Sequence, residues 1–250
     1  APTIGQVILL FAEWQWIFVF LIVLAVSSVI WLAFRQPETL SEDNRRPFSV
    51  LRIAMTVLEI LRIRESIGYT LMSGLMFSAF VGYLSSAQQV FQITYKLGDL
   101  FPLYFAALAS GLGLASYLNS KLVHKFGMRR LCRAASILIC CLTVVFVGVV
   151  YEMNGIPPLF LFMAFMMPAF FCFGILYGNF VALAMEPLGH IAGVGASVVG
   201  SISSLISVPL GALIGQQFNG TVLPLVIGFS VFSVTTFGLM CWVENGKKEL

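Results

Sequence analysis

The residues that usually carry enzyme chemistry are few in this chain and lie far apart. Its five cysteines form no Cys-x-x-Cys pair and lie mostly in apolar runs, so small buried side chains explain them better than a disulfide or metal site. The two histidines, His124 and His190, lie at the edges of apolar runs. A metal or haem site in a helical bundle needs several inward-facing ligands, and a membrane-embedded enzyme needs converging polar groups. We therefore expect no enzymatic activity, no metal and no cofactor.

Aromatic and methionine side chains at helical spacing form the pattern that best suits ligand binding. In 67–91, such residues recur with small ones between them and are followed by two glutamines. A second group lies in 158–185. Rings and flexible thioethers suit apolar ligands, although core packing produces the same pattern. The candidate substrate-binding residues are Tyr69, Met76, Tyr83, Gln88, Gln89, Phe170, Tyr177 and Asn179.

Long apolar helices must position these side chains. The chain is 59% hydrophobic and only 10% charged, whereas soluble domains carry about 25% charged residues. A bilayer core needs roughly 20 apolar helical residues, and the apolar runs do not alternate as membrane strands do. We predict an all-α transmembrane fold with one partial span, Ala1–Phe11, and seven complete spans: Trp16–Phe34, Ile67–Phe91, Leu100–Leu118, Ala134–Tyr151, Pro158–Met185, Val194–Gly215 and Val222–Val243.

The polar stretch 35–65 divides the chain. We interpret it as a linker between the end of one bundle, 1–34, and a six-helix bundle, 66–243, with a polar tail at 244–250. The linker holds six of the fourteen Lys and Arg residues, Asn119–Arg133 holds five, the tail holds two, and only Lys96 falls on the other side. Cations gather on the cytoplasmic side of membranes, so this bias places linker and tail in the cytoplasm.

No Asp, Glu, Lys or Arg lies deep in a predicted complete span. Buried ionisable residues usually mark proton or ion pathways. If the protein is driven by protons, we expect the coupling carboxylates to lie in a part that is not present here. Because the chain does not start with Met, we expect it to be cut from a longer protein.

This order of spans and linker resembles the major facilitator superfamily, in which a long cytoplasmic linker joins two six-helix bundles. The resemblance makes 1–34 the end of helix 5 and helix 6, followed by helices 7 to 12. Residues 1–6 (APTIGQ) are similar to the second half of the helix-5 antiporter motif G-P-x-x-G-G, matching at Pro2 and Gly5. Residues 120–130 (SKLVHKFGMRR) resemble the G-x-x-x-D-R-x-G-R-R gating loop. Gly127, Arg129 and Arg130 fit that loop, and His124 stands where its acidic residue would be.

Further strings resemble Bcr/CflA-type drug exporters, the bicyclomycin and chloramphenicol branch. They are EWQWIF from Glu13, PETL from Pro37, GYT from Gly68 and FGMRR from Phe126. The resemblance implies proton-coupled efflux of small drug-like molecules across a bacterial inner membrane. It also implies that the lipid bilayer, protons and an N-terminal bundle of the same chain are the partners, and that nucleic acid is not. A non-transporting receptor or assembly subunit on the same bundle is the alternative, and we expect this chain alone to be inactive.

Overall fold

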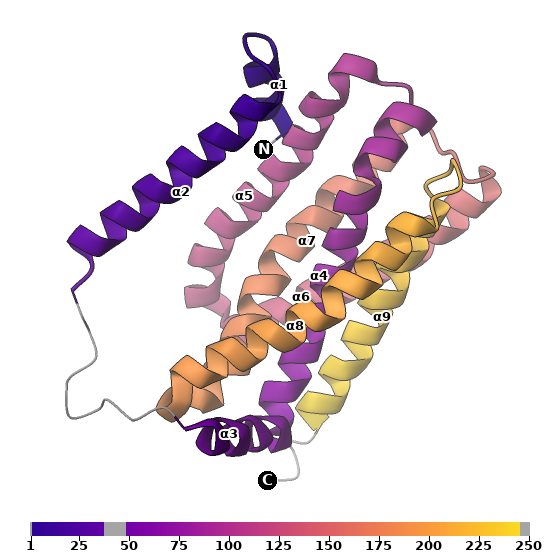
Figure 1. Cartoon of the computed structure of the whole chain (residues 1–250). Helices are drawn as coiled ribbons and strands as arrows, with labels where there is room; N and C mark the ends of the chain where they lie inside the picture. The colour runs from indigo at the N-terminus through magenta and orange to yellow at the C-terminus, as the bar shows by residue number, and fades with distance from the viewer. Residues whose placement is uncertain (1, 38–48, 246–250) are drawn as a thin grey trace. The chain divides into compact units, whose positions relative to one another are not determined.

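The computed structural model describes residues 2–37 and 49–245 (Figure 1). The regular elements in these two ranges are helices, and neither range contains a strand. This confirms the predicted all-α class. The chain divides into two compact units, Ala1–Leu51 and Arg52–Leu250, which are described separately.

The first unit contains two helices. α1 spans Pro2–Leu9 and α2 spans Gln15–Arg35. The predicted span Trp16–Phe34 therefore matches α2 closely. None of the residues of α2 is buried, and its apolar side chains point in all directions. A helix with this pattern is suited to lipid or to neighbouring helices on every side.

The second unit begins within a short amphipathic helix and continues with six long helices. The short one is α3 (Val50–Arg62). α4 (Arg64–Gln89) continues as a π-helical turn, Val90–Thr94, and a 3-10 turn at Gly98–Leu100 leads into the next helix. A second 3-10 turn, Glu186–Ile191, joins the fourth and fifth long helices. The remaining long helices are α5 (Phe101–Phe126), α6 (Met128–Glu152), α7 (Leu159–Met185), α8 (Ala192–Gln216) and α9 (Leu223–Asn245).

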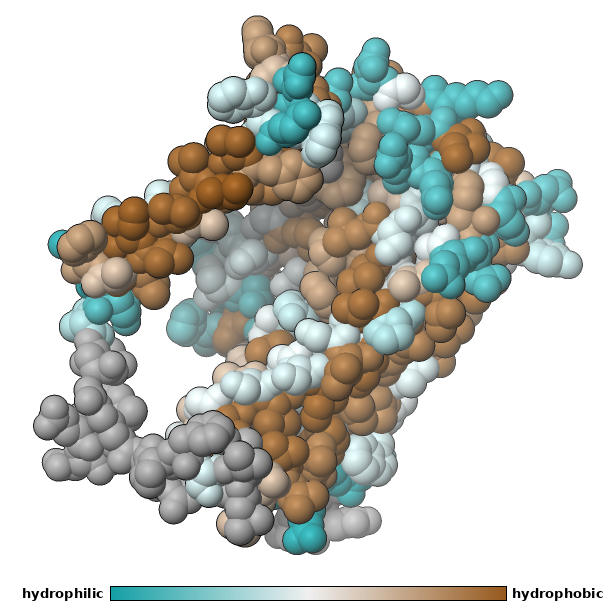
Figure 2. All heavy atoms as spheres, in the orientation of Figure 1, coloured by the Kyte–Doolittle hydropathy of each residue, from teal (hydrophilic) through white to brown (hydrophobic). Residues whose placement is uncertain are grey.

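Length and hydropathy make these helices able to cross a membrane. Six helical stretches of the described residues qualify, and one of them, Leu159–Gln216, is 58 residues long and contains both α7 and α8. Each of those two helices has at least 25 residues, enough for a crossing of its own. The protein is therefore a multi-pass membrane protein. Figure 2 shows hydrophobic residues along the helices and hydrophilic ones gathered near helix ends.

Two helices extend beyond their predicted spans. We predicted a polar segment, Asn119–Arg133, between spans; in the structure it is helical apart from one residue, Gly127, where α5 ends and α6 follows. Gly127 has φ 79°, a left-handed conformation that glycine adopts without a side-chain clash. Lys and Arg are good helix formers, so the helices continue past the apolar runs. Likewise, the predicted linker 35–65 contains α3, while its residues 38–48 lie outside the described residues.

α4 lies at the centre of the second unit and packs against α7, α8 and α9. Glycines permit the close contacts. A Cβ added to Gly211 of α8 would lie 2.5 Å from Val81 of α4, and one added to Gly82 of α4 would lie 2.8 Å from Ile214. α7 and α8 continue through their internal residues Pro168 and Pro209. We call the end of this unit at which α4 begins the linker end.

Candidate functional site

Four stacked rings form the feature of the second unit that best suits an apolar ligand. Phe77 and Phe80 of α4 meet Phe173 and Tyr177 of α7, and we call these four residues the aromatic face. The ring centroids of Phe77 and Tyr177 are 5.0 Å apart, and those of Phe80 and Phe173 are 4.9 Å apart. Phe77, Phe80 and Tyr177 remain partly exposed. These partly exposed rings, which stacking holds in place, suit contact with a flat hydrophobic molecule.

A polar side chain lies farther along the same strip of α4. Leu84 is seven residues after Phe77, and Gln88 is four residues after Leu84, so all three project within about 40° of each other at 3.6 residues per turn. Gln88 is exposed, and its amide nitrogen donates a long 3.4 Å hydrogen bond to Gln92. Gln89 is also exposed but projects about 100° away. Among the predicted substrate-binding residues, Gln88 therefore lies on the same strip of α4 as Phe77, which meets Tyr177 of α7. Gln89 lies outside that strip.

Tyr83 and Phe170 lie behind the aromatic face. Tyr83 is only 1% exposed, and its ring meets the edge of Phe170 at 4.8 Å. Phe170 in turn contacts Phe80 at 5.9 Å. These two predicted residues therefore support the exposed rings from inside the unit, and whether they touch substrate stays a prediction.

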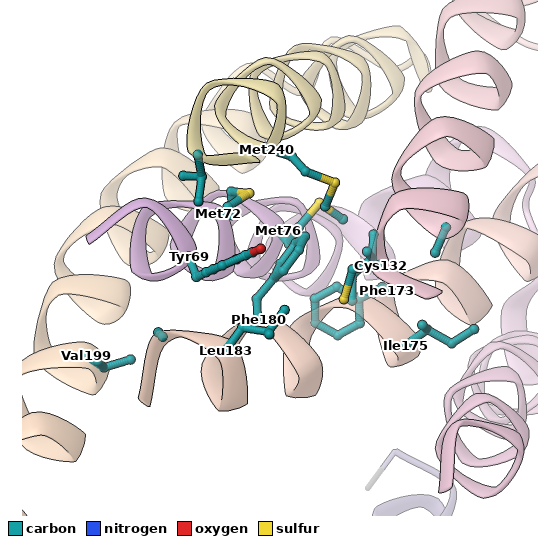
Figure 3. Packing of buried hydrophobic residues seen from close by; sticks show 14 of the residues in the cluster. Tyr69, Met72, Met76, Cys132, Phe173, Ile175, Phe180, Leu183, Val199 and Met240 are labelled. Carbon is teal, nitrogen blue, oxygen red and sulfur yellow. The ribbon is translucent and has the colours of Figure 1, made fainter. Parts of the chain in front are cut away.

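Tyr69 and Met76 belong to the core at the linker end. Both are buried, and Figure 3 shows them among other buried side chains between the helices. The ring of Tyr69 lies 6.0 Å from that of Phe180. In the structure they pack against protein on all sides.

The side-chain amide of Asn179 is hydrogen-bonded to the side-chain amide of another asparagine. It is 4% exposed on α7 and exchanges two hydrogen bonds with Asn119 of α5, at 2.8 and 3.2 Å. Each amide supplies the donor and acceptor that the other needs in an apolar setting. The pair therefore links α5 to α7 near the linker end.

The predicted gating loop holds a small ion cluster. Arg129, at the start of α6, donates to Glu186 at 2.6 Å and lies 3.5 Å from Glu65 at the start of α4. Its guanidinium also lies 5.9 Å from the ring of Tyr69. One cation thus joins three helix ends. Gly127 forms the break before Arg129, while Arg130 is exposed.

Two further arginines connect helix ends beside this cluster. Arg133 contacts Glu244 of α9, and Arg64 contacts the backbone carbonyl of Trp242 while lying over its ring. The carboxylate partners Glu65 and Glu186 were not among the predicted site residues. The predicted topology places these two glutamates on the same side of the membrane as Arg129, and this could have indicated that they pair with it. Three rings of the aromatic face were also not predicted: Phe77, Phe80 and Phe173. Phe173 could have been found through the i, i+3, i+7 spacing of Phe170, Phe173 and Tyr177 on α7.

The predicted helix-5 motif lies in the first unit. Pro2 opens α1, and Gly5 lies within it. A Cβ added to Gly5 would make an ordinary contact, 3.7 Å from Ile17 of α2. The motif therefore lies where α1 approaches α2.

Comparison with known proteins agrees with this architecture. A family profile described as Major Facilitator Superfamily matches residues 1–212. The chain belongs to the Major Facilitator Superfamily. Membership of this superfamily points to a transporter rather than an enzyme, and it confirms the family resemblance of the sequence.

Two curated relatives refine the comparison. The chain is 28% identical to an uncharacterized MFS-type transporter, YdgK, of Bacillus subtilis, over all of this chain and 61% of that protein. It is 25% identical to a bicyclomycin resistance protein homolog of Haemophilus influenzae, over 90% of this chain and 56% of that protein. The chain thus spans less than two thirds of the length of these relatives. No solved structure matches it.

Proposed function

We propose that this chain is part of a multidrug exporter that moves small drug-like molecules out of a bacterial cell in exchange for protons. Family membership supports transport. The exporter strings of the sequence and the name of one relative, a bicyclomycin resistance protein homolog, support drugs as the substrates. In this architecture, two bundles rock around a site between them.

The proposed setting is the inner membrane, with the linker end and the tail in the cytoplasm. Thirteen of the fourteen Lys and Arg residues support this orientation. An N-terminal bundle of the same protein would complete the substrate path and supply the proton-coupling carboxylates, since no carboxylate lies deep in the predicted spans of this chain. The proton gradient would be the energy source.

The proposal about the substrate rests on the aromatic face. It combines exposed ring surface with Gln88 farther along the same strip of α4. Rings would take most of the apolar contact, and an amide would orient a polar group of the drug. Tyr83 and Phe170 would hold the rings from behind, while Tyr69, Met76 and Asn179 would keep the helices in place.

Arg129 is proposed as the organising residue of the cytoplasmic gate. It joins the ends of α4, α6 and α7, so loosening its contacts would free those ends to move relative to one another. Gly127 would allow the chain to turn there, and Arg130 would keep the turn in contact with water. Pro2 and Gly5 would act in the first unit as the helix-5 motif of an antiporter.

Drug efflux by the whole protein tests the substrate proposal. Phe77→Ala should weaken efflux of aromatic drugs by up to about tenfold, since an aromatic contact contributes about 0.5–1.5 kcal/mol beyond burial. Phe160→Ala is the matched control, because Phe160 lies on α7, is 74% exposed and lies outside the aromatic face. Both variants are compared at equal membrane abundance. Equal losses in the two variants, or efflux that survives collapse of the proton gradient, would refute the proposal.

A further inference from the structure

The rest of the second unit covers only part of the apolar surface of the short helix α3. Ile60 is 1% exposed, and Val57 packs against the core at the linker end. Met55, Leu58 and Leu61 project in other directions and remain 55%, 55% and 40% exposed. The bundle therefore uses only part of the apolar side of this helix.

Helical geometry describes the uncovered part. At 100° per residue, the apolar positions Ile60, Val57, Leu61, Leu58 and Met55 span an arc of about 220°. The two buried residues occupy only the first 60° or so of that arc. Thr56 and Glu59 occupy the rest of the circumference, and Arg62 projects inside the arc, between Leu58 and Met55. A surface helix that needed only the bundle would carry a narrower apolar stripe.

The placement of α3 sets the direction of its axis relative to the long helices. α3 runs across the linker end of the second unit, while the long helices run along its length (Figure 1). Ile60 holds it on the core, and the imidazole of His190 lies 3.3 Å from the carboxylate of Glu59. If the long helices cross the membrane, a helix across their ends lies in the plane of the membrane surface. Thirteen residues are too few for a crossing of its own.

A hollow beside α3 combines apolar walls with one arginine and one glutamate, and that glutamate faces His190. Its volume is about 420 Å³, and Met55, Leu58, Ile63, Glu59 and Arg62 line it. Arg62 and, two residues later, Arg64 are exposed at this end. Such a lining complements an acyl chain below an anionic headgroup, because cations near the membrane attract acidic lipids. The charge of this end therefore favours phospholipid over a neutral partner surface.

We propose that α3 is an interfacial anchor that binds anionic phospholipids of the cytoplasmic leaflet. Leu58 and Leu61 enter the boundary between headgroups and acyl chains, and Arg62 faces the phosphates. In-plane helices with an apolar side and a basic edge bind membranes in this way. The orientation rests on the proposed topology; the substrate plays no part in it.

The contact between Glu59 and His190 connects this anchor to the ion cluster around Arg129. His190 and Glu186 belong to the same 3-10 turn, Glu186–Ile191. His190 meets Glu59 of α3, and Glu186 meets Arg129 of α6. Lipid that holds α3 therefore also restrains the turn that carries Glu186.

Depth-dependent quenching tests the anchor. An environment-sensitive fluorophore is attached at Leu58→Cys, or at Thr56→Cys as the matched control, in the whole protein from which all native cysteines have been removed. The protein is reconstituted into phosphatidylcholine vesicles with or without phosphatidylglycerol, and a phosphatidylcholine with a nitroxide on carbon 5 is the quencher. We expect quenching at position 58 to exceed that at position 56 by about twofold or more in the anionic vesicles, because the two side chains point about 160° apart.

The charge requirement needs a second variant. Arg62→Gln should reduce quenching at position 58 in the anionic vesicles and leave it unchanged in pure phosphatidylcholine. Equal quenching at positions 56 and 58 would overturn the proposal. Blue-shifted emission at position 58 without quenching would also overturn it, because protein would then cover the face. Drug efflux is not a readout, so a failed efflux assay leaves this inference standing.

Discussion

Hydroxyl groups inside the second unit are paired in some places and unpaired in others. Ser73 of α4 bonds Ser203 of α8 at 2.7 Å, and Thr143 of α6 bonds Ser233 of α9 at 2.8 Å. The hydroxyl of Tyr83 is buried and has no hydrogen-bond partner among the described residues. An unpaired buried polar group costs free energy. Tyr83 is therefore held by its ring contacts alone.

Tyr83→Phe and Tyr83→Ala should have opposite effects on stability. Removing the unpaired hydroxyl should raise the free energy of unfolding by up to about 1–3 kcal/mol, whereas truncating the ring should lower it by about 3–5 kcal/mol. Thermal unfolding of the purified protein in detergent measures both. Efflux per folded molecule should stay unchanged in Tyr83→Phe. A new rank order of drugs in that variant would instead show that the hydroxyl meets substrate.

The sequence indicated which residues of α4 were candidates but could not orient them. Tyr83 and Gln88 are about 140° apart on the helix, and the structure buries the first while exposing the second. In a soluble helix, the polar side would reveal which residue faces inward. α4 is apolar around most of its circumference because lipid tolerates what water does not. Only the packing of the neighbouring helices therefore decides which residue is buried, and Tyr83 packs against Phe105 of α5 and Phe170 of α7.

Glycines set the distance between helices at the scale of elements. The sequence contains two small-residue motifs, Gly174-x-x-x-Gly178 and Gly211-x-x-x-Gly215, which predict close approach. The structure uses three of these four positions. Added Cβ atoms at Gly174 and Gly215 would lie 2.7 Å from Ala115 and 2.6 Å from Ser85, whereas at Gly178 nothing lies within 4 Å.

Gly174→Ala and Gly178→Ala form a matched pair on one helix. The first should destabilise the protein by about 1–3 kcal/mol through overpacking of α7 against α5. The second should be neutral or stabilising by up to about 1 kcal/mol, because alanine is the better helix former. Thermal unfolding in detergent compares them directly. Equal destabilisation by both variants would show that α7 and α5 do not approach as described.

Helix ends were harder to predict than helix existence. The apolar runs located the spans, but α5 continues eight residues beyond the predicted end at Leu118, to Phe126. Hydropathy marks where lipid ends, while backbone hydrogen bonding continues until a residue such as Gly127 stops it. α3 was missed within the linker because arginines and glutamates there obscured an apolar arc that only a helical projection reveals.

Charge distribution describes the molecule as a whole. The ion contacts of Arg129 and Arg133 lie at the end from which α6 starts, the end at which α4 also begins. The connections at the opposite end carry a single cation, Lys96. The cation-rich end of a membrane protein stays in the cytoplasm. Family membership and composition thus agree on a polytopic protein, and the charge bias supports the proposed orientation.

Single-cysteine labelling in intact cells tests that orientation. In a background from which all native cysteines have been removed, Ser120→Cys at the linker end should resist a membrane-impermeant maleimide, whereas Gln217→Cys at the opposite end should react. Both native side chains are exposed, so access to protein surface does not separate them; only the membrane does. Ser41, which lies outside the described residues, should behave like Ser120. Permeabilised cells provide the control, in which every site should react. Labelling of Ser120→Cys with protection of Gln217→Cys in intact cells would invert the topology, and it would move Arg129, α3 and the proposed lipid contact to the outer face.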